Sequence, residues 1–229
     1  AEAPEPVAEA AEFPGSVRVA QPEGKRGSLK WLQRAIEHRP DLLQPAELAR
    51  IEWISPIRAD DFAEYRDGDF LSAVGLPHLT DELSAFWPKR GPQWDALGRV
   101  SNTVVLVEAK AHIGEFLSPP SQASAASRAK IDAAFGSVRA ALGVTTKTDW
   151  AEVFFQYANR IAHLWFLREK GVSAELLFVS FLNDTVMDGP STAETWEAAF
   201  AVANHALGLG KAHGLARHIR HIYPDARLL

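Results

Sequence analysis

The chain has 229 residues, of which 47% are hydrophobic, and it carries a formal net charge of -5. A chain of this size can bury one sizeable core, so we expect a single domain. The net negative charge argues against a protein that coats nucleic acid through bulk electrostatics, because phosphate affinity depends on Lys and Arg. Any contact with nucleic acid would be confined to a local cleft.

The sequence contains no cysteine. This excludes a disulfide framework and a thiolate metal site, and it fits a reducing cytoplasm. No apolar run approaches the roughly 20 residues that a bilayer span requires. We therefore expect a cytoplasmic protein without a membrane partner, while the oligomeric state stays open.

Residues 1–22 are rich in Ala, Glu and Pro and show no sustained hydrophobic period. This composition indicates a flexible tail, which leaves residues 23–229 as the folded domain. The first expected helix is capped by Ser28 and ended by Pro40. A short strand follows at residues 51–57, then a polar stretch at 58–68 and a short helix at 80–87.

The next two extended segments, residues 93–100 and 103–113, are separated by only two residues and predict a hairpin. In this register the numbers of opposed residues sum to 203. Asp95 would therefore face Glu108, and Gln93 would face Lys110.

Side chains of paired strands alternate between the two faces of the sheet. One face is expected to be apolar throughout, with Trp94, Ala96, Val105, Val107, Ala109 and Ala111. The other face begins apolar and becomes charged toward Asp95, Glu108, Lys110 and His112. We expect a core face that opens into a cleft.

Carboxylates at opposed positions have Cβ atoms roughly 4.5 to 5.5 Å apart, and like charges there destabilise the pair. A divalent cation would relieve this repulsion. Mg2+ or Mn2+ takes oxygen ligands, so Asp95 and Glu108 form a suitable partial shell. Lys110 lies on the same face, where its ammonium could orient an attacking water or stabilise charge on a phosphoryl oxygen.

These residues resemble the D-x(n)-E-x-K core of the PD-(D/E)XK, or restriction-endonuclease-like, nucleases. The resemblance implies a mixed sheet flanked by helices, with Mg2+ held by Asp95, Glu108 and the carbonyl of Ala109, and with Lys110 serving the nucleophile. Trp94 stands where the family usually has a proline before the Asp.

A longer stretch, residues 86–120, together with the later Gln-Tyr-Ala-Asn-Arg segment at 156–160, resembles bacterial proteins of unassigned function within that superfamily. The resemblance implies a fold but no substrate.

Other interpretations of the charged residues remain open at this stage. Lys110 could simply form a salt bridge with Glu108 or Asp95 on an exposed sheet edge, a contact worth about 0 to 1 kcal/mol. His112 fits a polar rim better than a catalytic role. Glu37, on the first helix, is the best-placed candidate for an additional acid of the kind that many family members use.

Downstream, a helical period at residues 131–142 predicts a packing helix. Asp149 and Glu152 are typical of an acidic capping box that starts a helix ending at Lys170. Residues 176–182 form an apolar run expected of a strand buried on both faces, and 192–207 predict another helix. The expected fold class is α/β.

In the helix that ends at Lys170, four polar residues fall on one stripe: Gln156, Asn159, Arg160 and His163. The stripe is either the one line of the helix that touches water or a line turned toward the metal cleft. In the second case Arg160 would contact a phosphate, and the Gln156 side chain would form a hydrogen bond in the region of Lys110.

The sequence thus favours a Mg2+- or Mn2+-dependent phosphodiesterase, with a nuclease acting on DNA or RNA as the leading hypothesis. The alternative is a non-catalytic binding or assembly module that keeps the nuclease-like fold. A weaker third hypothesis is a hydrolase of another phosphorylated substrate, since metal chemistry alone does not select nucleic acid.

Overall fold

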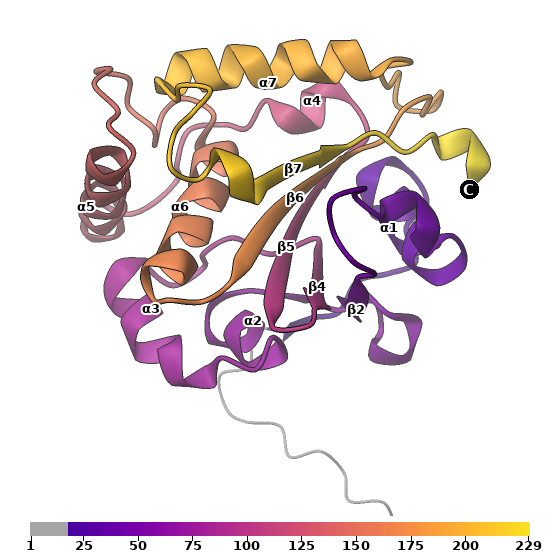
Figure 1. Cartoon of the computed structure of the whole chain (residues 1–229), viewed down its shortest axis with the longest axis horizontal. Helices are drawn as coiled ribbons and strands as arrows, with labels where there is room; N and C mark the ends of the chain where they lie inside the picture. Colours follow the sequence, from indigo (N-terminus) through magenta and orange to yellow (C-terminus); the bar gives the residue numbers. More distant parts are fainter. Residues whose placement is uncertain (1–17) are drawn as a thin grey trace, which may run out of the picture.

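The structure, a computed structural model, describes residues 18–229 and is α/β, with a mixed five-stranded sheet flanked by helices (Figure 1). The sheet has the order β2-β4-β5-β6-β7. β2, β4 and β5 pair antiparallel, whereas β5, β6 and β7 pair parallel. The strands are β2 (Glu52–Ser55), β4 (Ala96–Val100), β5 (Thr103–Lys110), β6 (Ala174–Ser180) and β7 (Ile219–Ile222).

Helices cover both faces of this sheet, and each face has its own apolar cluster (Figure 1). On one face α1 contributes Leu32 and Ala35 to a cluster with Val105 of β5. On the opposite face α5, α6 and α7 pack against a larger cluster that includes Leu106 of β5. The helices are α1 (Gly27–His38), α2 (Asp67–Ala73), α3 (Thr80–Phe86), α4 (Ile113–Phe116), α5 (Ala125–Ala141), α6 (Phe155–Glu169) and α7 (Ala193–Leu207).

The predicted hairpin and its register are confirmed where β4 and β5 pair. Val100 lies opposite Thr103, and Leu97 lies opposite Leu106. The two faces also alternate as expected over this stretch, because Leu97, Val104 and Leu106 join the cluster on the α6 face. The predicted apolar face on the α1 side holds Ala96, Val105, Val107, Ala109 and Ala111.

The hairpin ladder ends earlier than the sequence predicts. Its last pair is Ala96 with Val107, so Asp95 is not paired with Glu108, and Gln93 is not paired with Lys110. The chain bends at Asp95, and Trp94 instead bridges Tyr65.

This bend also breaks the predicted alternation of faces. Trp94 packs on the α6 face and not on the α1 face. Its ring lies 6.0 Å from that of Phe70 and 6.2 Å from that of His163. A large aromatic side chain gains burial in this aromatic layer, which the sequence register alone does not include.

Several predicted boundaries differ from the structure; for example, the strand predicted over residues 103–113 ends at Lys110. Residues Arg18–Val19 fall within the predicted tail but form β1, which pairs with β3 (Glu64–Tyr65); the rest of that tail, residues 1–17, lies outside the described residues. Ser28 lies inside α1, whose N-cap position is Arg26.

The predicted capping box at Asp149 and Glu152 does not start α6, which begins at Phe155. Both carboxylates instead bind Arg128 of α5, at 2.5 and 2.6 Å. Asp149 Oδ1 also accepts a hydrogen bond from the Ala151 N–H at 2.9 Å, so it stabilises a turn that ends before the helix begins.

The helices predicted at residues 80–87, 131–142 and 192–207, and the buried strand at 176–182, correspond to α3, α5, α7 and β6. The sequence did not predict α2, β3, α4 or β7. None of the helices in residues 18–229 combines the length and the apolar character that a bilayer crossing requires.

Candidate active site

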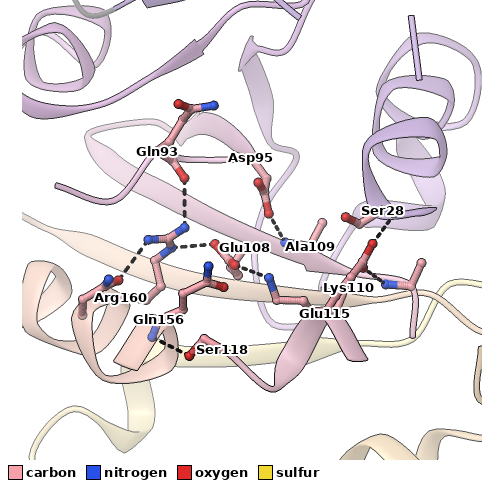
Figure 2. Close-up of polar contacts among 12 residues, drawn as sticks. Ser28, Gln93, Asp95, Glu108, Ala109, Lys110, Glu115, Ser118, Gln156 and Arg160 are labelled. Atoms are coloured by element: carbon pink, nitrogen blue, oxygen red, sulfur yellow. Dashed lines mark hydrogen bonds and ion pairs between the residues drawn. The ribbon is translucent and has the colours of Figure 1, made fainter. Parts of the chain in front are cut away.

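Glu108 lies near the carboxyl end of β5, at the centre of the sheet, and is only 3% exposed. One carboxylate oxygen, Oε2, accepts a hydrogen bond from Arg160 Nε of α6 at 2.5 Å. The other, Oε1, forms an ion pair with Nζ of Lys110 (Figure 2). Two cations from different elements therefore share one buried carboxylate.

Asp95 reaches the same strand from the segment that precedes β4. Its Oδ2 accepts a hydrogen bond of 2.7 Å from the backbone N–H of Ala109, the residue between Glu108 and Lys110 (Figure 2). Asp95 is thus brought to the Glu-Ala-Lys segment of β5 by a side-chain contact, and the predicted strand pair with Glu108 is wrong. The bend at Asp95 is what makes this contact possible.

The same contact fixes the direction of the Ala109 carbonyl. In a strand, the N–H and C=O of one residue point to the same edge. Because the N–H of Ala109 points toward Asp95, its carbonyl oxygen faces that side too, beyond the last pair between β4 and β5. Carboxylate and carbonyl oxygens therefore lie on one side of β5.

The pKa values of these groups follow from burial and from each other's charge. Burial, and next the negative charge of Glu108, raises the pKa of Asp95 well above its usual range. Burial also acts to raise the pKa of Glu108, but the charges of Arg160 and Lys110 outweigh it and leave that pKa lowered. For Lys110 burial is outweighed by Glu108 and Asp95, so its pKa is raised and its ammonium keeps its proton.

A third carboxyl group in this region, Glu64, was not predicted. It belongs to β3 and is 6% exposed. Its Oε2 accepts hydrogen bonds from Gln93 Nε2 at 2.5 Å and from Gln21 Nε2 at 3.0 Å. Burial, with a contribution from the charge of Glu108, raises the pKa of Glu64 to about 7.

Local sequence gave no signal for Glu64, because it lies in the polar stretch 58–68. It reaches the site only through two long-range pairings of β3: with β1, and with Trp94 through Tyr65.

The polar stripe of α6 faces inward, so its interpretation as a wet face is wrong. Asn159, Arg160 and His163 are all buried. Besides Glu108, Arg160 donates to Asn159 Oδ1 and to the Gln93 carbonyl, both at 2.9 Å. His163 is enclosed by aromatic rings, and burial lowers its pKa to about 3, which keeps it neutral.

Arg160 therefore reaches the Lys110 region, as the alternative interpretation of the stripe expects, but it binds Glu108. Gln156 is half-buried at the start of α6, and its backbone N–H donates to Ser118 Oγ at 3.0 Å. Figure 2 shows the Gln156 side chain directed to the same side of β5 as Glu108.

The two other candidates lie apart from these contacts. Glu37 is exposed on α1, which covers the opposite face of the sheet, and its Oε1 pairs with Arg58 Nε at 2.5 Å. His112 is the N-cap residue of α4, and its Nε2 lies 3.6 Å from Glu115 Oε1. The structure thus does not bring Glu37 to the site and gives His112 a position at its rim.

The salt-bridge interpretation of Lys110 predicts the right contact but the wrong environment, because the pair is buried and not on an exposed sheet edge. Lys110 does pair with Glu108, yet β5 is the central strand, and the two side chains are only 12% and 4% exposed. In this environment the pair is not a weak surface contact.

The donor set of the site is made of hard oxygen atoms: the carboxylates of Asp95 and Glu108 and the carbonyl of Ala109. Such donors suit Mg2+ or Mn2+. Within residues 18–229 no group of three or more His, Cys, Asp or Glu side chains is arranged to hold a metal ion. A cation at this point would bind two carboxylates and a carbonyl, and it would share Glu108 with Lys110 and Arg160.

Comparisons of the chain with protein-family models, with curated protein sequences and with solved structures find no significant match. The resemblance to PD-(D/E)XK nucleases therefore depends on the residues of the chain itself.

Proposed function

We propose that the chain is a Mg2+- or Mn2+-dependent phosphodiesterase with a restriction-endonuclease-like fold, and that it acts as a nuclease on DNA or RNA. The observation that carries this proposal is the hydrogen bond from Ala109 N–H to Asp95. It brings a second carboxylate to the Glu-Ala-Lys segment of β5, which is the juxtaposition that the D-x(n)-E-x-K resemblance implies. The mixed sheet and the helix-then-strand order after the hairpin support the same assignment.

Each residue of the candidate site has a separate role in this proposal. Asp95, Glu108 and the Ala109 carbonyl would hold the cation, which when bound lowers the pKa of a water ligand and polarises the phosphoryl group. Because Lys110 keeps its proton, it acts as a donor that orients the attacking water or stabilises developing negative charge, and not as a general base. Arg160 fixes the carboxylate of Glu108 in place.

A non-catalytic binding or assembly module is the second candidate, and one observation favours it. Both oxygens of Glu108 already contact internal cations, so the cluster is neutralised within the chain itself. A nuclease-like domain that has only a structural role would look like this.

Incubation with supercoiled, linear and single-stranded DNA and with RNA, in Mg2+, Mn2+ or EDTA, separates the two candidates. We expect metal-dependent cleavage by the wild type and its loss in Lys110→Ala. Lys211→Ala, which removes an exposed lysine outside the site, serves as the matched control. If no substrate is cleaved, or if Lys110→Ala cleaves as well as the control, the enzymatic proposal is wrong.

A further inference from the structure

A pocket of about 650 Å³ lies directly beside the Glu108–Arg160 pair. It is enclosed by the loop between α3 and β4, the loop before α5 and the first turn of α6. Arg160, Gln93 and Gln156 line it, so it shares residues with the candidate active site.

The pocket is basic although the chain has a net charge of -5. Lys89, Arg90 and Arg160 line it, and no acidic residue does. Glu108 balances the charge of Arg160, whereas Lys89 and Arg90 are exposed and form no ion pair with any residue of the described chain. Two cations that form no ion pair within the described residues therefore line the pocket, where they can attract an anion.

The backbone that carries these cations is held in place. The carboxylate of Asp67 accepts hydrogen bonds from the backbone N–H groups of Arg90 and Gly91, at 3.0 and 2.9 Å. Arg90 has a φ of 66°, a left-handed conformation that such contacts maintain. The position of the cationic loop is therefore built into the fold, which lowers the entropy cost of binding.

The inner wall of the pocket is aromatic. The rings of Trp87 and Phe155 are stacked, with centroids 6.5 Å apart and planes at 20°. Four prolines line the pocket as well, and the side-chain amides of Gln93, Gln156 and Asn159 add hydrogen-bonding groups. Trp87 is only 4% exposed, so the half-buried Phe155 is the ring that a ligand can reach. An aromatic ring with amides beside it suits a planar ring that carries donors and acceptors at its edge.

The volume limits what can enter. Pockets of about 300 to 1,000 Å³ take small molecules, so this one can hold about one nucleotide and not a duplex. A base must be unstacked and unpaired before it can lie against protein aromatic rings in a pocket of this kind.

We propose that this pocket binds one nucleotide of a single-stranded end, with its phosphate on Lys89 and Arg90 and its base against Phe155, which Trp87 supports from behind. The inference builds on the proposed nuclease function, because the pocket shares Arg160 with the candidate active site, where that side chain binds Glu108. It narrows the substrate class to single-stranded or unpaired nucleic-acid ends.

Calorimetric titration in EDTA, with no divalent metal present, tests the pocket separately from catalysis. The probe is a thymidine dinucleotide with a 5′-phosphate, compared with the unphosphorylated dinucleotide, inorganic phosphate and a blunt duplex. The test variant is Lys89→Gln combined with Arg90→Asn, since Asn tolerates the left-handed backbone at this position. Lys211→Gln is the control.

We expect the phosphorylated dinucleotide to bind the wild type and the control equally, and the double variant at least tenfold more weakly. The unphosphorylated dinucleotide and inorganic phosphate should each bind the wild type at least tenfold more weakly than the probe. Absence of binding, unchanged affinity in the double variant, or equal affinity for phosphate alone or for the duplex overturns the proposal.

If the dinucleotide binds in EDTA but no substrate is cleaved in Mg2+, the pocket proposal holds and the nuclease proposal is wrong. If a substrate is cleaved in Mg2+ but the dinucleotide does not bind in EDTA, the nuclease proposal holds and the pocket proposal is wrong.

Discussion

Arg160 on α6 and Glu108 on β5 form a buried ion pair, with Nε and Oε2 2.5 Å apart and side chains 7% and 4% exposed. The pair joins the helix that covers one face of the sheet to the central strand. Its two charges are separated by 52 residues in the chain. Removing either charge leaves the other in a poorly solvated position.

Arg160→Met should therefore destabilise the fold strongly, by about 3 kcal/mol, because it removes one of the two cations that neutralise the buried Glu108 carboxylate and leaves only Lys110. Urea unfolding measures this loss. Arg128→Gln is the control: that arginine has three carboxylate partners at the surface and should lose only about 1 kcal/mol or less. Equal losses in the two variants would contradict a structural role for the buried pair.

Mn2+ should raise the melting temperature of the wild type more than that of Asp95→Asn. Neutralising Asp95 removes one of the two negative charges that a cation would bind, while the amide oxygen of Asn can still accept from Ala109. At 100 times the dissociation constant, binding adds about 2.7 kcal/mol to the free energy of unfolding. Differential scanning calorimetry with and without Mn2+ gives the shift, and Glu47→Gln provides an exposed acidic control. Identical shifts in wild type and Asp95→Asn would reject this metal site.

Glu64 should make stability fall as the pH rises through neutrality. Its pKa is raised from a usual value near 4.5 to about 7, chiefly by burial. The unfolded chain therefore releases this proton at lower pH than the folded chain does. The favourable contribution of Glu64 is complete below about pH 4.5, and it decreases until the pH passes about 7.

Glu64→Gln keeps an acceptor for Gln93 and Gln21 but does not titrate. Relative to the wild type it should gain stability between these two pH values, by about 3 kcal/mol for the full interval. Urea midpoints at pH 4.5 and 8 measure the change. A gap between the variant and the wild type that stays constant with pH would show that Glu64 titrates normally.

Glu115 should hold the end of β5 against α1. Its Oε2 accepts from the Ala111 N–H at 2.7 Å, and its Oε1 accepts from the Ser28 N–H in the first turn of α1 at 3.3 Å (Figure 2). Glu115→Ala leaves both donors unpaired and should cost about 1 to 3 kcal/mol. Glu115→Gln retains one acceptor oxygen and should recover part of this loss in thermal unfolding; failure to recover any would argue for a packing effect.

Elements whose partners are local or strongly periodic were predictable from the sequence. The hairpin of β4 and β5 followed from a two-residue turn between apolar segments, and the buried strand β6 followed from its continuous apolar run. Glu108 and Lys110 could be placed together because they are two residues apart on one strand. The inward direction of Arg160 could not be decided, since a polar stripe has the same period whether it meets water or a buried carboxylate.

Features that depend on non-local contacts were missed or misplaced. Asp95 was expected on a paired strand, whereas the contact of Trp94 with Tyr65 takes it out of the ladder. Glu64 was not predicted at all, because only the pairing of β1 with β3 gives it a position. The start of α6 was misplaced: Asp149 and Glu152 both bind Arg128 of α5, and α6 begins only at Phe155.

Because Asp95 lies just outside the β4–β5 ladder, the two sides of the site should differ in the free energy that local opening requires. Glu108 belongs to a strand paired with β6 in the middle of the sheet, so its amide proton should exchange with solvent only when the whole molecule unfolds. Asp95 is tied to that strand by the hydrogen bond that its Oδ2 accepts from the Ala109 N–H, so the Ala109 amide proton should exchange whenever this contact opens. Its segment can separate from β5 through a local fluctuation of much lower free energy, while the sheet stays intact.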